Sequence, residues 1–382
     1  MEKNSNKILS LWGNILKRTK RFIVPYTIAV ILIIVISFFT LQKANTTYGF
    51  DETLTVYEKV RDHKTVRYTV IGDSIGRGSG AETPGARWFK ILERKMQERG
   101  IRMSGEYIVQ SGATAFEGLY RLSTLEKPGK SDLVFIVFGE NDRKYMAAND
   151  FGIIYESLFR KAKAFYPNAE IMAITESSLS SGDFADEIEK ISTHYQAAHI
   201  DMRSVFKNTG IPPEDLTRDL VHPNGRGYQL YADTIYRQLL INTKKEKEIA
   251  AIIEPFNGHL IETFRTVSSF QTKEGFIWKN GYMTSERKGS YLESEFEGNI
   301  LGVKLLRSPN GGEVKVYIDG EFVTAISTWW PFHRERQLYL ASSLSEGKHT
   351  VRFEVSGNKP RHNTTGSSVI RISSIIEGIA EY

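Results

Sequence analysis

The hydrophobic pattern of the chain begins with an uninterrupted apolar run at residues 22–41, which contains no charged side chain. A helix rises about 1.5 Å per residue, so this run would span roughly 30 Å, the thickness of a bilayer core. Buried helices of that length usually keep a polar face, and the apolar core of a signal peptide is shorter. We therefore predict an uncleaved, single-pass transmembrane helix at residues 22–41, followed by a polar stalk at residues 42–65.

Between residues 66 and 243, short apolar runs alternate with segments of helical spacing. The runs at 66–71 and 133–138 have the continuous apolar character of strands that are buried on both faces. The segments 86–99 and 225–240 repeat apolar residues at the helical period. This alternation predicts a doubly wound α/β domain, in which helices cover both faces of a parallel sheet. In such a sheet the ligand site lies beyond the carboxyl ends of the strands.

The pattern changes at a charged segment, residues 244–255, which we interpret as a linker. Beyond it, apolar and polar residues alternate, as at residues 313–318, and the following Asp319-Gly320 is typical of a hairpin turn. Short strands separated by turns predict an all-β sandwich or jelly roll at residues 256–382.

The net charge of +5 belongs to the N-terminal tail. Residues 1–21 contain six basic side chains and one acidic one, so the remainder of the chain is neutral. A neutral chain offers no basic field for nucleic acid. Basic residues before the apolar run predict a cytoplasmic N-terminus, with the rest of the chain outside the membrane. The chain has no cysteine, which excludes disulfides, thiolate metal sites and a cysteine nucleophile.

Four polar blocks carry the candidate chemistry. A Gly-Asp-Ser sequence ends the first predicted strand and places Ser74 at the mouth of the sheet, and Gly112 and Asn141 follow the next two strands. Asp219 precedes His222 by three residues, a spacing at which a carboxylate can orient an imidazole. Each block alone also fits ordinary turn chemistry or a helix cap. Their order along the chain is more informative than any single block.

Together these blocks resemble those of the SGNH, or GDSL, hydrolase superfamily, over roughly residues 66–242. The resemblance implies a flavodoxin-like fold, with Ser74 as the nucleophile, His222 as the general base and Asp219 orienting the base. It also implies an oxyanion hole made by the backbone N–H groups of Ser74 and Gly112 and by the Asn141 amide. We expect no cofactor, and no histidine and carboxylate cluster has the spacing of a metal site.

These features predict a membrane-anchored, extracytoplasmic serine esterase that removes short O-acyl groups, O-acetyl foremost, from cell-envelope carbohydrate. A polar segment at 176–186, which follows a strand onto the active face, suits a sugar better than a long acyl chain. The C-terminal part loosely resembles the jelly-roll modules that accompany carbohydrate esterases, as in its hairpin at 316–320. Its aromatic residues Trp329, Trp330 and Phe332 could contact glycan, although adjacent aromatic residues in strands more often belong to a core.

Three alternatives stay open at this point. An O-acetyltransferase would pass the acyl group to a glycan hydroxyl, and a lipase or thioesterase would act on membrane lipid. A non-catalytic envelope-binding protein would have lost its site chemistry, and the intact polar blocks argue against that reading.

Overall fold

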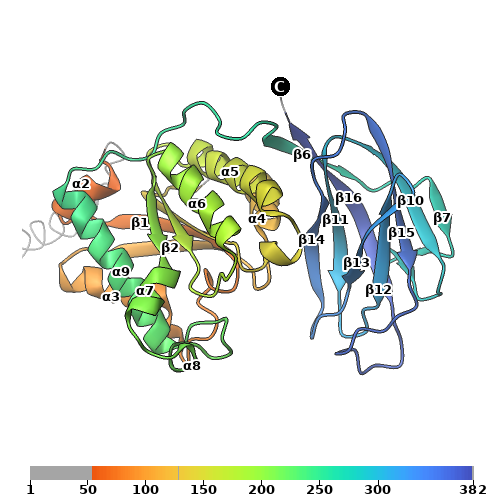
Figure 1. Ribbon diagram of the computed structural model, residues 1–382, viewed down its shortest axis with the longest axis horizontal. Helices are drawn as coiled ribbons and strands as arrows, with labels where there is room; N and C mark the ends of the chain where they lie inside the picture. The colour runs from red at the N-terminus through yellow and green to blue at the C-terminus, as the bar shows by residue number, and fades with distance from the viewer. Residues whose placement is uncertain (1–53, 128, 381–382) are drawn as a thin grey trace, which may run out of the picture. The chain divides into compact units, whose positions relative to one another are not determined.

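A five-stranded parallel sheet forms the centre of the N-terminal part of the structure, a computed structural model that describes residues 54–127 and 129–380 (Figure 1). The strand order is β2-β1-β3-β4-β5, and all neighbouring strands are parallel. The chain thus winds outward from β1 in both directions, as predicted for a doubly wound sheet. The strands are β1 Val66–Gly72, β2 Met103–Val109, β3 Leu133–Val137, β4 Glu170–Thr175 and β5 Ala198–Asp201.

Helices cover both faces of this sheet (Figure 1). Successive side chains of a strand point to opposite faces, so in β1 Val70 joins the core under one helical layer and Ile71 joins the core under the other. The layer on the Val70 face contains α2 Val56–Arg61, α3 Trp88–Glu98, α7 Met202–Asn208 and α9 Gly225–Lys244. The layer on the Ile71 face contains α4 Ala115–Ser123, α5 Ala148–Phe165 and α6 Gly182–His194. The short helices are η1 Pro84–Ala86, η2 Asp142–Lys144 and α8 Pro213–Leu216.

The C-terminal part is an antiparallel β-sandwich, as the alternating pattern predicts. One sheet has the order β13-β12-β15-β10-β7 and the other β14-β11-β16-β9-β8, with β6 paired to β16. Apolar side chains on the inner faces of the two sheets form one core. The strands are β6 Ile261–Val267, β7 Thr272–Glu274, β8 Ile277–Lys279, β9 Tyr282–Ser285, β10 Tyr291–Glu297, β11 Ile300–Arg307, β12 Glu313–Ile318, β13 Glu321–Ser327, β14 Arg334–Ala341, β15 Lys348–Val355 and β16 Ile370–Ala380.

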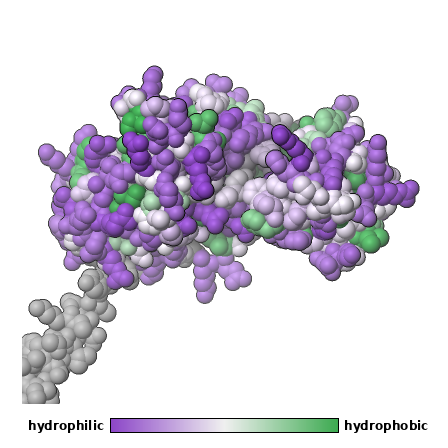
Figure 2. Space-filling model, turned by 90° about the horizontal axis from the view of Figure 1, so that it is seen from below, coloured by the Kyte–Doolittle hydropathy of each residue, from purple (hydrophilic) through white to green (hydrophobic). Residues whose placement is uncertain are grey.

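The helical layer that contains α4 packs against the β-sandwich. Phe116 of α4 lies edge-on to Phe264 of β6 and close to Tyr339 of β14, with ring centroids 5.4 and 6.0 Å apart. One buried apolar cluster includes residues of both parts. The connecting segment is also fixed, because the Ala250 N–H donates a hydrogen bond of 2.9 Å to the buried Glu170 carboxylate. On the face shown in Figure 2, hydrophilic residues predominate and the hydrophobic ones form small separate groups.

The transmembrane helix in the predicted fold class, and the single-pass membrane location derived from it, are corrected by the structure. No helix within residues 54–127 and 129–380 is long and apolar enough to cross a bilayer. The two longest of these helices, α9 and α5, are amphipathic: each buries an apolar stripe and carries charged residues, such as Arg237 on α9, outside it. The predicted span at residues 22–41 lies outside the described residues. The supported architecture is an α/β part with a parallel sheet, followed by an all-β part.

Candidate active site

Ser74 lies in the turn that follows β1, at the carboxyl edge of the parallel sheet. The preceding Asp73 stabilises this turn, because its carboxylate accepts a hydrogen bond of 2.7 Å from the Ile75 backbone N–H. Ser74 is only 5% exposed. Its hydroxyl is therefore held against neighbouring loops rather than surrounded by solvent.

Ser74, His222 and Asp219 form a continuous chain of hydrogen bonds. Ser74 Oγ lies 3.0 Å from His222 Nε2, and His222 Nδ1 lies 2.8 Å from Asp219 Oδ2. The second carboxylate oxygen, Oδ1, accepts the His222 backbone N–H at 2.8 Å. One side chain thus fixes both the backbone and the ring of the histidine. Nucleophile, base and orienting acid can act in this arrangement as they do in serine hydrolases.

Gly80 allows the loop that carries His222 to approach the Ser74 turn. Its φ is 98°, and a Cβ at this position would stand 2.8 Å from the His222 Cβ and 2.5 Å from the Pro223 carbonyl oxygen. Both distances are too short for a side chain. The Tyr228 hydroxyl of α9 also donates to the Ser79 carbonyl at 2.6 Å, which joins the same two segments. Sequence analysis did not identify the contact between these two segments, because it depends on a single glycine and a single tyrosine that belong to no motif.

Asn141 and Gly112 lie on two further loops at the same edge of the sheet. Asn141 follows β3, and its Nδ2 donates to Asp73 Oδ2 at 2.5 Å. Gly112 follows β2 and has a left-handed φ of 73°. The Gln110 N–H donates to the Gly72 carbonyl at 3.1 Å, which holds the Gly112 loop beside the end of β1. The structure therefore joins three of the five predicted site residues in one hydrogen-bonded chain. It places the other two, Gly112 and Asn141, on the adjoining loops.

Three buried acidic side chains, Asp73, Asp142 and Glu176, lie at these strand ends. Burial raises the pKa of Asp73 to about 6, against the lowering effect of its hydrogen bonds, first among them the one to Glu176. Burial also raises the pKa of Asp142 to about 7 and that of Glu176 well above its usual range. Asp142 accepts the Ala115 N–H at 2.7 Å, and Glu176 accepts the Glu140 N–H at 2.8 Å. Sequence analysis missed Asp142 and Glu176; the available signal was an acidic residue just beyond an apolar strand.

Side chains of the β-sandwich reach the loop that carries Gly112. Arg336 of β14 is 1% exposed, and its Nη2 donates to the Gly112 carbonyl at 2.7 Å and to the Glu117 carboxylate of α4 at 2.8 Å. The Trp330 ring centroid lies 5.6 Å from the Arg336 Cζ. Its Cη2 atom is 3.6 Å from the position of a Cβ on Gly112. Sequence analysis weighed Trp330 as a core or glycan residue and did not identify Arg336, which is 219 residues away from Glu117.

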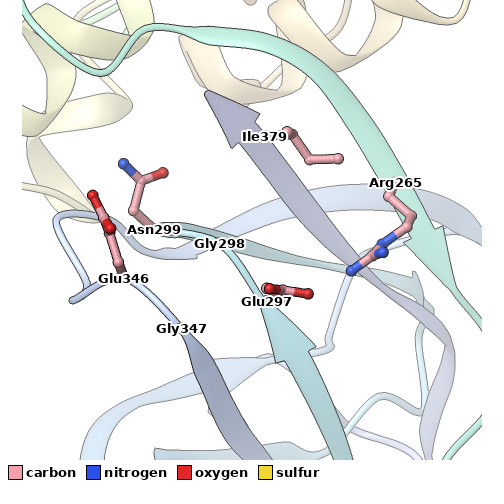
Figure 3. Close-up of a pocket in the computed structure, with 7 residues that line it drawn as sticks. All are labelled: Arg265, Glu297, Gly298, Asn299, Glu346, Gly347 and Ile379. Atoms are coloured by element: carbon pink, nitrogen blue, oxygen red, sulfur yellow. The ribbon is translucent and has the colours of Figure 1, made fainter. Parts of the chain in front are cut away.

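A separate cavity of about 630 Å³ lies in the β-sandwich (Figure 3). Figure 3 shows Arg265 of β6 and Glu297 of β10 directed toward the same space. Arg265 already forms an ion pair with Glu377, so its charge is balanced within the sandwich. None of the residues predicted from the sequence lines this cavity. The candidate chemistry is therefore concentrated at the edge of the parallel sheet.

Residues 70–230 match the model of the GDSL-like lipase/acylhydrolase family. The α/β part is a GDSL-like domain. The match includes all five residues predicted for the site, from Ser74 to His222. The chain accordingly carries a GDSL-like acylhydrolase domain and is an ester hydrolase. No curated protein matches its sequence.

The GDSL domain and the β-sandwich together have a counterpart among solved structures. A two-domain esterase active on acetylated mannans is similar over 85% of this chain and 94% of its own, with 16% identity and a TM-score of 0.66. A second structure of that esterase, co-crystallised with mannopentaose, gives the same values. At this identity the likeness shows the fold, which extends over both parts. An acetylxylan esterase from Geobacillus stearothermophilus is 20% identical and covers 46% of this chain and 94% of its own, with a TM-score of 0.38.

Proposed function

We propose that this GDSL esterase removes short O-acyl groups, acetyl foremost, from carbohydrate, with Ser74 as its nucleophile. The observation that carries the proposal is the hydrogen-bonded chain from Ser74 through His222 to Asp219. A serine hydroxyl becomes an effective nucleophile only when a base takes its proton. An imidazole whose other nitrogen is held by a carboxylate is suited to that role.

In the proposed first step, Ser74 Oγ attacks the ester carbonyl carbon while His222 Nε2 takes the hydroxyl proton. The carbonyl oxygen becomes an oxyanion, which the N–H groups of Ser74 and Gly112 and the Asn141 amide stabilise. An asparagine amide has two hydrogens, so the one that is not bound to Asp73 stays available for the oxyanion. The C–O bond to the sugar then breaks, and the sugar oxygen leaves with the proton from His222.

The second step returns the enzyme to its starting state. Water attacks the acyl carbon of acyl-Ser74, and His222 takes a proton from that water. The same three donors stabilise the second oxyanion. When the bond to Ser74 Oγ breaks, His222 returns the proton to the serine and the carboxylic acid is released.

Two observations support a carbohydrate ester as the substrate. The esterase that shares the two-domain fold is active on acetylated mannans, and it was co-crystallised with mannopentaose. In this chain, Trp330 offers an indole edge beside Gly112, and indole rings are common contacts for sugar rings.

We also propose the domain limits 66–243 for the hydrolase and 256–382 for the β-sandwich accessory domain, with 244–255 as the linker.

The proposal can be tested with acetylated manno-oligosaccharides and a series of p-nitrophenyl esters of increasing acyl length. We expect acetate release from the sugars, a specificity constant that falls with acyl length, and fluorophosphonate labelling that is lost in Ser74→Ala. Cleavage of long-chain esters without release of sugar acetate would support a lipase instead. Transfer of acetyl from an activated ester to the sugar, in place of hydrolysis, would support an acetyltransferase.

A further inference from the structure

Arg307, the last residue of β11, is a buried cation on which the Glu117 carboxylate acts only from a distance. It is 7% exposed, and it forms no ion pair with a carboxylate anywhere in the described part of the chain. Its Nε has no hydrogen-bond partner among the described residues. By contrast, buried Lys59 pairs with Asp132 at 2.7 Å, and Arg336 pairs with Glu117. Burial of an unpaired charge is unfavourable, so the position of Arg307 calls for a ligand.

The neighbours of Arg307 place it beside the active site. The Trp330 ring centroid lies 6.0 Å from the Arg307 Cζ, and the same ring borders Gly112. The Tyr145 hydroxyl is near enough to the guanidinium to raise its pKa. Tyr145 directly follows the short helix η2, which begins directly after Asn141. Trp330 therefore lies between Arg307 and the loop that carries Gly112, and Tyr145 links Arg307 to the segment that carries Asn141.

The surroundings of Arg307 have an excess of positive charge. Arg336 and Arg121 share a single carboxylate, that of Glu117, at 2.8 and 3.8 Å. Exposed Arg334 lies directly opposite Arg307 in the pairing of β11 with β14. Burial, together with the charge of Arg336, lowers the pKa of Arg307. The Glu117 carboxylate therefore acts on three guanidinium groups, those of Arg336, Arg121 and Arg307, and Arg334 adds a fourth positive charge.

Other carboxylates near this group are already engaged. Glu140 pairs with Arg143 at 2.7 Å and with Lys144 at 3.4 Å. Glu335, which precedes Arg336 on β14, pairs with Lys304 at 3.1 Å. A negatively charged group from outside the described chain would therefore offset the excess of positive charge around Arg307.

We propose that Arg307 binds an anionic group, a carboxylate or a phosphate, on the glycan whose ester is cleaved at Ser74. A guanidinium presents a planar fork of N–H donors that matches both anions. Trp330 would lie against the sugar ring that carries the group. The substrate class is then an O-acylated acidic glycan. This inference rests on the proposed esterase function, and it deepens that function by naming the charge of the substrate.

Three matched sugar esters test the inference: an O-acetylated methyl glucoside, the corresponding methyl glucuronide, and the corresponding 6-phosphate. For the wild-type protein, we expect kcat/KM for at least one anionic ester to exceed that of the neutral ester by about 10- to 100-fold, the range of a charge-assisted hydrogen bond. Arg307→Met should remove this preference, so that kcat/KM becomes about equal for the neutral and the anionic esters. The carboxylate and phosphate arms identify which anion is bound.

Two further variants separate recognition from folding. Arg361→Met makes the same chemical change at an exposed position of the β-sandwich and should leave all three rates unchanged. Arg307→Lys keeps the charge without the fork, so it should fold even if Arg307→Met does not, and it should retain only part of the preference.

Hydrolysis of p-nitrophenyl acetate by the wild-type protein, and its loss in Ser74→Ala, tests the esterase function separately. If that activity is absent, the proposed function fails and this inference fails with it. If it is present, equal rates on neutral and anionic sugar esters overturn the inference alone. Equal losses on all three esters in both Arg307 variants would show a structural role and would also overturn it.

Discussion

At the scale of single residues, the Ser74 hydroxyl can be removed with little effect on packing, because its side chain forms a hydrogen bond within the described chain only to His222. We expect Ser74→Ala to lower ester hydrolysis by about 1,000-fold or more and to leave the melting temperature within a few degrees of wild type. Ser204→Ala, an equivalent change on the exposed side of α7, is the control and should stay fully active. Residual activity of more than a few percent in Ser74→Ala would reject Ser74 as the nucleophile.

In the proposed mechanism, Asp219 supports the base without acting as the base. In Asp219→Asn the side-chain oxygen can still accept the His222 N–H, but the amide nitrogen cannot accept from His222 Nδ1. We therefore expect a loss in kcat for Asp219→Asn that is smaller than the loss for His222→Ala, by at least about tenfold. Kinetics of both folded variants on the same ester measure the difference. Equal or reversed losses would contradict the assigned roles.

The buried Glu176 makes stability depend on pH. Its pKa is raised in the folded state, so the folded protein holds a proton that the unfolded chain loses above about pH 4.3. The free energy of unfolding should therefore fall as pH rises above that value, by roughly 1.4 kcal/mol per pH unit for one proton, until the folded-state pKa is reached.

Glu176→Gln should remove this part of the pH dependence, because glutamine stays neutral and its oxygen can still accept the Glu140 N–H. Urea unfolding at several pH values from 4 to 8 gives the free energy of unfolding at each pH. The slope of this free energy against pH should be shallower for Glu176→Gln than for wild type. Glu189→Gln, at an exposed position of α6, should keep the wild-type slope. Identical slopes for the wild type and Glu176→Gln would mean that Glu176 ionises normally in the folded protein.

The sequence predicted the polar residues that follow strands, because a parallel sheet places such residues at one edge. Ser74, Gly112 and Asn141 could be recognised in this way, and Asp219 and His222 by their spacing of three residues. The residues that surround them could not: Arg336 and Trp330 come from a separate β-sandwich, and no local pattern indicates which loop they meet. Residues that act across folded parts become visible only when the packing is known.

At the scale of elements, the prediction was weakest for strands at the edges of the parallel sheet. The second strand, Met103–Val109, and the fifth strand, Ala198–Asp201, both lack the continuous apolar run of the central strands. Both are edge strands with polar residues such as Glu106 and His199. An edge strand buries less of its surface than a central one, so its apolar signal is weak. The central strands β1 and β3 were found because both of their faces are buried.

The contact between α4 and β14 should depend on the buried pair of Glu117 and Arg336. Removal of one partner of a buried ion pair leaves an unpaired charge and typically costs about 3–5 kcal/mol, so Arg336→Met should destabilise the protein by that order. The double variant Arg336→Met, Glu117→Leu should be clearly more stable than the sum of the two single changes implies. Chemical unfolding of all four proteins measures the coupling, with Arg334→Met as an exposed control on the same strand. Strict additivity would show that the two side chains do not interact.

At the scale of the whole molecule, the sequence predicted an α/β part followed by an all-β part, but it could not predict how the two pack. A hydrophobic pattern shows which faces are apolar and does not identify their partners. The structure joins them through one apolar cluster that includes Phe116 of α4 and Tyr339 of β14. We therefore expect one cooperative thermal transition, with equal calorimetric and van't Hoff enthalpies. Two resolved transitions in a calorimeter would show that the parts unfold independently.

The hydrogen bonds of Arg336 also bear on how such a chain can evolve. A binding module on a loose tether can be exchanged between enzymes by recombination, because the enzyme does not depend on it. Here an exchange of the β-sandwich would leave the Glu117 carboxylate without its counter-charge and would remove the donor to the Gly112 carbonyl. The two parts are therefore expected to be inherited together, and a change in the contact surface of one would select for a matching change in the other.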